Sequence, residues 1–283
     1  MRLVRYGAVG AERPGVLDQE GRIRDLGDRV PDIDAAALSP PGLARLRALN
    51  VGALPLVPGT PRFGACVARP HKFICIGLNY ADHAREGGVA VPSEPEVFTK
   101  ATSAISGPND PIIKPRGSTK LDWEVELALV IGSVCRYADE RAALASIAGY
   151  CVCNDVSERL FQLERGKQWD KGKGCDSFGP IGPWLVTADE VDTSDLALWL
   201  DVNGKRQQSG STRDMIFNPV FIVSYVSQYM TLEPGDVIST GTPAGVGLGQ
   251  KPPKYLNVGD TVKLGITGLG EQQQTVVACD TAQ

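Results

Sequence analysis

Two glutamates separated by a single residue are the most chemically informative feature of the sequence. Glu124 and Glu126 lie in the run Asp-Trp-Glu-Val-Glu-Leu-Ala-Leu-Val-Ile, whose apolar second half is typical of a strand buried on both faces. Because side chains alternate along a strand, both carboxylates project from the same face. Burying two neighbouring carboxylates is unfavourable unless they are paired, and a shared divalent cation would relieve their repulsion. The alternative is the end of an edge strand, where both would face water.

A third acidic residue follows another apolar run. Asp155 ends the segment Gly-Tyr-Cys-Val-Cys-Asn-Asp (149–155), which is typical of a second buried strand. With Glu124 and Glu126 it would form an all-oxygen ligand set that leaves positions for water and substrate. Such a set suits Mg²⁺ or Mn²⁺ better than Zn²⁺. Alternatively, Asp155 caps a helix that begins near Glu158, and the two roles could hold together.

The two histidines of the chain differ in their surroundings. His83 lies three residues before Glu86, so a helix would place both on one face, where Glu86 could orient an imidazole that takes a proton from water. Gly87-Gly88 would end that helix, and the proline-interrupted segment 89–95 is expected to form a mobile lid. The alternative is a surface Glu86 and a His83 that packs against its own helix. His71 follows a proline and is expected to be structural.

Four further side chains could serve an anionic substrate. Arg159 and Gln162 are three residues apart and would share a helical face, while Lys173 supplies a compact cation. Thr242 lies in Gly-Thr-Pro-Ala-Gly-Val-Gly, where backbone N–H groups and the hydroxyl could hold a carboxylate. The alternatives are a solvent-exposed lysine and an ordinary turn.

The elements that must position these residues are short, and most are strands. Residues 1–66 are expected to form a small N-terminal domain with short strands, a helix near 42–49 and a linker at 55–61. Residues 67–283 are expected to form the metal-binding catalytic domain. Its apolar runs predict strands, and two further segments, 139–146 and 219–229, predict helices. The fold class is therefore strand-rich α+β. The predicted strands are 73–77, 124–131, 149–154, 181–186, 196–202, 236–239 and 261–266.

Composition excludes several classes of protein and of metal site. A chain of 283 residues with 42% hydrophobic residues is expected to fold, and a net charge of −4 disfavours nucleic acid as a partner. The sequence lacks an apolar run that could span a membrane and a secretory signal, so we expect a cytoplasmic protein. Two histidines exclude a three-histidine zinc site. The seven cysteines include no C-x-x-C, which disfavours disulfides and thiolate metal sites.

Five ordered motifs, spread over roughly residues 70–270, resemble the fumarylacetoacetate hydrolase superfamily. In chain order they are Gly77-Leu-Asn-Tyr-Ala-Asp-His-Ala-Arg-Glu86, Asp122-Trp-Glu-Val-Glu-Leu127, Asn154-Asp-Val-Ser-Glu-Arg-Leu-Phe-Gln162, Lys173-Gly-Cys-Asp-Ser-Phe-Gly-Pro-Ile-Gly-Pro-Trp184 and Ile238-Ser-Thr-Gly-Thr-Pro-Ala-Gly-Val-Gly247.

The resemblance implies a mixed β-sandwich roll behind a small N-terminal domain, and assembly as a homodimer. It implies Mg²⁺ or Mn²⁺ at the positions of Glu124, Glu126 and Asp155. It makes His83 and Glu86 a catalytic dyad. It also gives Lys173 a catalytic and substrate-binding role and places Arg159 and Gln162 in the same pocket.

Within the superfamily, Ser157-Glu-Arg, Gln168-Trp169 and Lys171-Gly-Lys-Gly-Cys-Asp resemble a bacterial sugar-acid branch. This implies hydrolysis of the C3–C4 bond of a 2,4-diketo-3-deoxy sugar acid, with L-2,4-diketo-3-deoxyrhamnonate giving pyruvate and L-lactate as the expected case. The alternatives are acylpyruvate hydrolysis, oxaloacetate decarboxylation, ureidoglycolate lysis and a metal-dependent 2-oxo-acid binding module without turnover. Leu160 departs from the aspartate of many members and could alter the pocket wall.

Overall fold

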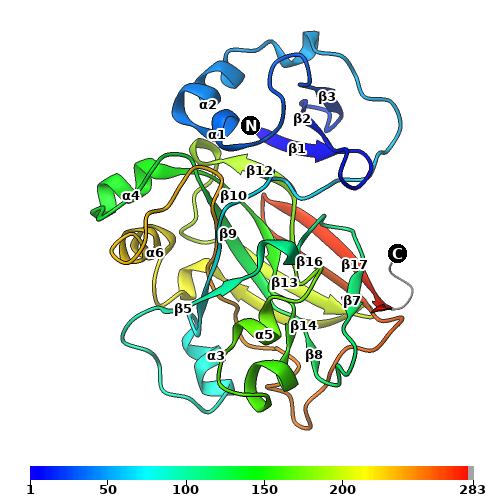
Figure 1. The fold of residues 1–283 in the computed structure, drawn as a ribbon, viewed down its shortest axis with the longest axis vertical. Helices are drawn as coiled ribbons and strands as arrows, with labels where there is room; N and C mark the ends of the chain where they lie inside the picture. The colour runs from blue at the N-terminus through cyan, green and yellow to red at the C-terminus, as the bar shows by residue number, and fades with distance from the viewer. Residues whose placement is uncertain (280–283) are drawn as a thin grey trace.

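The structure, a computed structural model, describes residues 1–279. Within them a mixed ten-stranded sheet runs through the centre of the molecule (Figure 1). Most neighbouring strands are antiparallel, although β15 and β4 are parallel. In spatial order the strands are β3 (Ile23–Asp25), β2 (Arg13–Leu17), β1 (Arg2–Tyr6), β12 (Gly179–Thr187), β10 (Ile147–Asn154), β9 (Val125–Ile131), β15 (Val237–Ser239), β4 (Phe73–Gly77) and β5 (Glu96–Lys100), with β6 (Ile105–Ser106) paired to β12.

A second, five-stranded sheet packs against β9, β10 and β12. The apolar core between the two sheets includes Leu127 and Val152 from the large sheet and Leu200 and Leu264 from the small one. This sandwich confirms the predicted strand-rich α+β class. The second sheet contains, in order, β14 (Lys205–Ser211), β13 (Ala197–Val202), β16 (Thr261–Ile266), β17 (Gly270–Ala278) and β7 (Ile112–Lys114).

The strand that carries Glu126 lies at the centre of the large sheet. All seven residues of β9 are buried, as its apolar run predicts, because β10 and β15 flank it and the second sheet covers it. Just before β9, the short strand β8 (Leu121–Asp122) pairs with β11 (Ser157–Glu158). This pairing brings the residues after Asp155 beside the start of β9.

The helices are short, and the residues at the start of α6 explain where that helix begins. Pro219 begins α6, and the side chain of Asn218 accepts a hydrogen bond from Phe221 N at 2.9 Å. None of the helices in the described part of the chain has the length and apolarity needed to cross a bilayer. The helices are α1 (Ala35–Leu38), α2 (Pro40–Arg47), α3 (Ala81–Glu86), α4 (Glu140–Ser146), α5 (Asp170–Lys173) and α6 (Pro219–Val226), with shorter turns η1 (Val51–Ala53), η2 (Thr102–Ala104), η4 (Ala188–Glu190) and η5 (Thr212–Asp214).

The segment after Asp155 does not form the regular helix that the sequence offers as an alternative. Ser157–Glu158 form β11, and Leu160–Glu164 form a π-helical turn, η3. The alternative of Asp155 as a helix cap is therefore wrong, because its carboxylate contacts Lys100 and Lys173 instead.

The N-terminal strands continue the large sheet and do not form a sheet of their own. Leu3 of β1 lies opposite Leu185 of β12, and β2 and β3 follow outward (Figure 1). One apolar cluster joins both parts, with Leu3 and Leu38 packed together with Cys151 and Leu185. The hydrogen-bonded sheet therefore crosses the domain boundary predicted after residue 66, and the division into two domains stays a prediction.

Candidate active site

A cavity of about 190 Å³ collects the predicted site residues. It opens between α3, the start of β9, η3 and the glycine-rich loop after β15. Eight of the nine predicted site residues line the cavity, and the ninth, Glu86, contacts the lining residue His83. These eight are His83, Glu124, Glu126, Asp155, Arg159, Gln162, Lys173 and Thr242.

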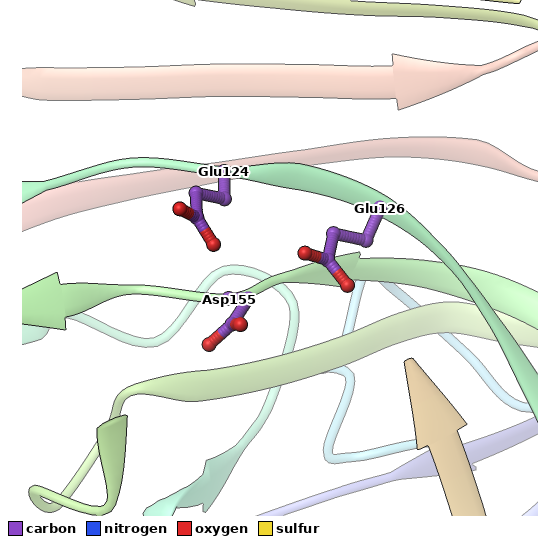
Figure 2. Close-up of side chains that lie close together, drawn as sticks. All are labelled: Glu124, Glu126 and Asp155. Carbon is purple, nitrogen blue, oxygen red and sulfur yellow. The ribbon is translucent and has the colours of Figure 1, made fainter. Parts of the chain in front are cut away.

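The three acidic side chains converge, and Glu124 and Glu126 share a face as the strand periodicity predicts. Glu124 precedes β9, Glu126 lies within it and Asp155 directly follows β10. Figure 2 shows the three carboxylates facing a common space. One oxygen from each lies within 4.8 Å of the others, and the three residues are at most 4% exposed.

Two buried lysines neutralise part of this charge. Lys173 Nζ lies 2.7 Å from both Glu124 Oε2 and Asp155 Oδ2. Burial alone would lower the pKa of Lys173, but Asp155 and Glu124 raise it above its usual value, so the ammonium stays charged. Lys100 Nζ lies 2.5 Å from Asp155 Oδ1 and donates to the carbonyl oxygens of Val156 and Lys173.

Glu126 has a different environment from Glu124. Burial alone would raise the pKa of Glu124, but Lys173 and Arg159 hold it below its ordinary value. Glu126 Oε2 accepts hydrogen bonds from neutral donors, Ser239 Oγ at 2.5 Å and the backbone N–H of Gly241 at 2.9 Å. Burial, followed by the charges of Asp155 and Glu124, raises the pKa of Glu126 well above its ordinary value.

The donor set fits a hard divalent cation. Oxygen ligands alone suit Mg²⁺ or Mn²⁺. The buried network holds four carboxylates, including that of Asp122, against the cations of Lys100, Arg159 and Lys173, so one negative charge remains when all four are ionised. A divalent cation bound by Glu124, Glu126 and Asp155 would offset the repulsion at Glu126. This agreement between charge and geometry supports a metal site; the identity of the ion stays a prediction.

Arg159 joins the acidic strand to its surroundings. Its Nε donates to Asp122 Oδ2 at 2.8 Å and its Nη2 to Glu124 Oε1 at 2.5 Å. Its Nη1 donates to Gln162 Oε1 at 3.0 Å, which leaves the Gln162 amide nitrogen as the donor available to the cavity. All three guanidinium nitrogens therefore hold protein groups in place.

The His83–Glu86 pair forms on α3 as its spacing predicts. His83 Nδ1 and Glu86 Oε2 are 3.5 Å apart, a long contact of the kind that can shorten when substrate binds. The backbone N–H of Gly245 donates to both Glu86 oxygens at 3.1 Å. A Cβ at Gly249 would lie only 2.1 Å from the Glu86 carboxyl carbon, so a side chain at this position would displace the Glu86 carboxylate.

The hydroxyl of Thr242 is already engaged. It donates to the carbonyl of Val125 at 2.9 Å and accepts from Gln208 Nε2 at 2.8 Å. It lines the cavity and ties the glycine-rich loop to β9, while its predicted contact with a substrate carboxylate stays a prediction. His71 lies away from the cavity, 72% exposed, with Nδ1 at 3.3 Å from Glu233. The glycine pair after Glu86 ends α3 as predicted.

Three residues of this network were not predicted as functional from the sequence. Lys100 ends a polar, half-exposed strand, which gives no sign of a buried ammonium. Asp122 stands two residues before Glu124 and could have been suspected from that spacing. Gly245 acts through its backbone N–H toward a residue 159 positions away, and no local pattern predicts that contact.

A family model for the C-terminal domain of fumarylacetoacetate (FAA) hydrolase matches residues 72–277, and all of the cavity-lining residues lie within that range. The chain belongs to the fumarylacetoacetate hydrolase family. The observed sheet sandwich is the fold of family members whose structures are solved.

Similar proteins support enzymatic activity for this family member. A putative hydrolase of Burkholderia multivorans is 63% identical over 276 residues, covering 97% of this chain and 98% of the relative. The solved fumarylacetoacetate hydrolase from Exiguobacterium antarcticum is 38% identical with a TM-score of 0.86, covering 98% of this chain and 99% of that one.

Two further solved structures carry names that state reactions. The maleylpyruvate hydrolase from Sphingobium sp. SYK-6 is 30% identical with a TM-score of 0.81, covering 98% of this chain and all of that one. The 5-carboxymethyl-2-hydroxymuconate delta-isomerase from Mycobacterium smegmatis is 32% identical with a TM-score of 0.76, covering 98% and 99%. This member of the fumarylacetoacetate hydrolase family is therefore an enzyme, of a superfamily of hydrolases and isomerases.

Proposed function

We propose that the protein hydrolyses the C3–C4 bond of a 2,4-dioxo acid in a reaction that depends on Mg²⁺ or Mn²⁺ and releases pyruvate. The observation that supports this most is the shared cavity: His83, backed by Glu86, and the trio of Glu124, Glu126 and Asp155 face the same space. Hydrolysis needs both a base for water and stabilisation of a departing enolate.

The acidic trio would hold the cation. When bound there, Mg²⁺ or Mn²⁺ supplies a Lewis acid that favours the enolate form of a 2-oxo acid. Lys173, with its ammonium between Glu124 and Asp155, would attract the substrate carboxylate to the same end of the cavity. Gln162 would donate to a substrate oxygen through its amide nitrogen, while Arg159 keeps Gln162 and Glu124 in position.

His83 would act as the base. With Nδ1–H directed to Glu86, its Nε2 has a lone pair that takes a proton from water while the water oxygen adds to C4. The C3–C4 bond then breaks, its electron pair forms the enolate of pyruvate, and C4 leaves as a carboxylic acid. The proton held by His83 returns to C3. Glu86 stays ionised and stabilises the charged imidazole, and Gly245 N–H keeps it in place.

Within this reaction class we favour L-2,4-diketo-3-deoxyrhamnonate as substrate, with pyruvate and L-lactate as products. Its C4 carries a short, uncharged hydroxyethyl group. Seven apolar side chains line the cavity beside the acidic trio, which suits a compact tail of this kind: Ile76, Leu78, Val89, Phe98, Leu163, Trp169 and Leu248.

Pyruvate release from this acid, followed by proton NMR with Mg²⁺ and with a chelator, tests the proposal. We expect release that requires the metal and yields one lactate per pyruvate. If the enzyme releases pyruvate from other 2,4-dioxo acids but does not cleave this sugar acid to pyruvate and lactate, the proposed reaction class holds and the proposed substrate is wrong. No metal-dependent pyruvate from any short 2,4-dioxo acid would contradict the proposal.

Proton transfer without cleavage is the second candidate. The similar delta-isomerase favours it, since a base facing the cavity could move a proton between carbon atoms of a bound enol. Enzyme-dependent exchange of substrate C3 protons in D₂O, faster than in buffer alone and with the carbon chain intact, would support this candidate against hydrolysis.

A further inference from the structure

Two chemically different groups of side chains line the cavity. The acidic trio, Lys173 and His83 form its charged part. Apolar side chains form its apolar part, in which Phe98 and Trp169 contact each other edge to face with ring centroids 5.5 Å apart. If the carboxylate and 2-oxo group of the substrate bind at the charged part, the acyl tail beyond C4 is left to contact the apolar part.

The backbone of β4 holds the aromatic wall in place. A Cβ at Gly77 would lie 2.7 Å from the Trp169 ring, so the indole rests directly on the glycine. Lys173 Nζ lies 5.1 Å from the Phe98 ring centroid. Phe98 therefore contacts both the Trp169 ring and the Lys173 ammonium, so the aromatic wall adjoins the charged part of the cavity.

The cations of the cavity are already paired. Among the described residues that line it, the lysine and arginine side chains are Lys173 and Arg159. Lys173 contacts two carboxylates, and Arg159 contacts Asp122 and Glu124. A second carboxylate on the tail would therefore meet apolar walls without a free cation to pair with it.

We infer that the apolar lining of the cavity selects 2,4-dioxo monocarboxylates with a short, uncharged acyl tail and excludes acids whose tail carries a second carboxylate. This inference rests on the proposed function for the site. The exclusion arises because burying an unpaired carboxylate is strongly unfavourable, while a methyl group gains from the same contacts.

A matched pair of substrates tests the inference. Butanoylpyruvate and succinylpyruvate have the same chain length and differ in a terminal methyl or carboxylate group. With Mg²⁺ we expect kcat/KM for butanoylpyruvate to exceed that for succinylpyruvate by about 100-fold or more. Equal values, or a preference for succinylpyruvate, would overturn the inference and leave the proposed hydrolysis intact.

A charge added at the cavity wall should change this preference. Leu163 lies on η3 and is 47% exposed, so an arginine there is tolerated at the rim and brings a cation to the tail. Leu163→Arg should lower the ratio of kcat/KM for butanoylpyruvate to kcat/KM for succinylpyruvate about 10-fold, because it improves cleavage of succinylpyruvate. The control Leu144→Arg, on α4 at 55% exposure and away from the cavity, should leave the ratio unchanged. A ratio that Leu163→Arg does not move would overturn the assignment.

Binding separates the inference from the reaction. Calorimetric titration of the Mg²⁺-loaded His83→Ala variant measures the affinity for each acid without turnover. Tighter binding of butanoylpyruvate supports the inference even if the wild type cleaves neither acid, a result that contradicts the proposed function alone. Equal affinity for the two acids contradicts the inference.

Discussion

At the scale of single residues, the three acidic side chains differ in how their charge is balanced. Glu124 contacts Lys173 and Arg159, and Asp155 contacts Lys100 and Lys173, whereas the donors to Glu126 Oε2 are a hydroxyl and a backbone N–H. Glu126 is therefore the carboxylate whose ionisation depends most on a bound cation.

Removing the charge of Glu126 should stabilise the metal-free protein. The pKa of Glu126 is raised in the folded state, so ionisation of this carboxyl opposes folding. Protonated Glu126 contributes to the free energy of unfolding in full below the ordinary glutamate pKa, and this stabilisation is lost as pH rises toward the folded-state pKa. Glu126→Gln keeps an acceptor for Ser239 and Gly241 without the charge. In chelator, its melting temperature should exceed that of the wild type, with a gap that widens above about pH 4.5. A melting temperature below that of the wild type at neutral pH would contradict this.

Replacing His83 by alanine should separate catalysis from metal binding. The side chain of His83 pairs with Glu86 and is not one of the proposed metal ligands, so His83→Ala should retain Mg²⁺ affinity and lower kcat for 2,4-dioxo acid hydrolysis by about 100-fold or more. Any oxaloacetate decarboxylation should survive the change, because it needs no activated water. Steady-state kinetics on both acids provide the measurement, and unchanged hydrolysis would exclude His83 as the base.

At the scale of elements, Asp122 connects the metal strand to the loop that holds the catalytic pair. Its Oδ1 accepts from Gly247 N at 2.6 Å, and its Oδ2 accepts from Leu248 N at 3.0 Å and from Arg159 Nε at 2.8 Å. The same loop supplies the Gly245 N–H that fixes Glu86. One carboxylate at the end of β8 thus positions groups on both sides of the cavity.

Asp122→Asn should lower kcat more than it weakens metal binding. The amide nitrogen of asparagine would face the Arg159 and Leu248 donors, so at least one of these hydrogen bonds is lost. We expect kcat to fall about 10- to 100-fold with an unchanged circular dichroism spectrum. Asp214→Asn, a 59% exposed control, should behave like the wild type. Equal effects of the two substitutions would contradict the role given to Asp122.

The helices and strands also differ in how much of the site could be predicted from the sequence. The shared face of Glu124 and Glu126 and the His83–Glu86 pair follow from local periodicity, because a strand alternates its side chains and a helix returns to one face every three or four residues. The approach of Asp155 to the two glutamates depends instead on the pairing of β9 with β10. Strands β14 and β17 were not predicted, because their many polar residues do not give the apolar pattern that is typical of a strand. Gln208, Gln272 and Gln274 are buried there. Gln208 and Gln272 bond backbone groups of β9 and β10 in the other sheet, and Gln274 bonds Gln272 within β17. Such contacts depend on the tertiary fold and leave no local pattern.

At the scale of the whole molecule, the N-terminal strands form part of the catalytic sheet. Leu3 pairs opposite Leu185 across 182 residues of sequence, a contact that local patterns could not predict. The apolar cluster that includes Leu38 and Cys151 spans both parts of the chain. Assembly as a homodimer and a cytoplasmic location stay predictions.

A fragment of residues 67–283 should therefore not fold by itself. Removing residues 1–66 leaves an edge of β12 unpaired and exposes the side chains that pack against Leu3 and Leu38. We expect an aggregated fragment and a single calorimetric unfolding transition for the full chain. A soluble fragment with the near-ultraviolet spectrum of a packed core, or two separate transitions for the full chain, would contradict this prediction.

The shared cation site is tested most directly by Mn²⁺ titration followed by electron paramagnetic resonance. With the wild type we predict loss of the free Mn²⁺ signal at one equivalent, competition by Mg²⁺, and loss of this site in Glu126→Gln while that variant remains folded. Tight Mn²⁺ binding by Glu126→Gln equal to that of the wild type, or free Mn²⁺ throughout the wild-type titration, would contradict the assignment of Glu124, Glu126 and Asp155 to one metal ion.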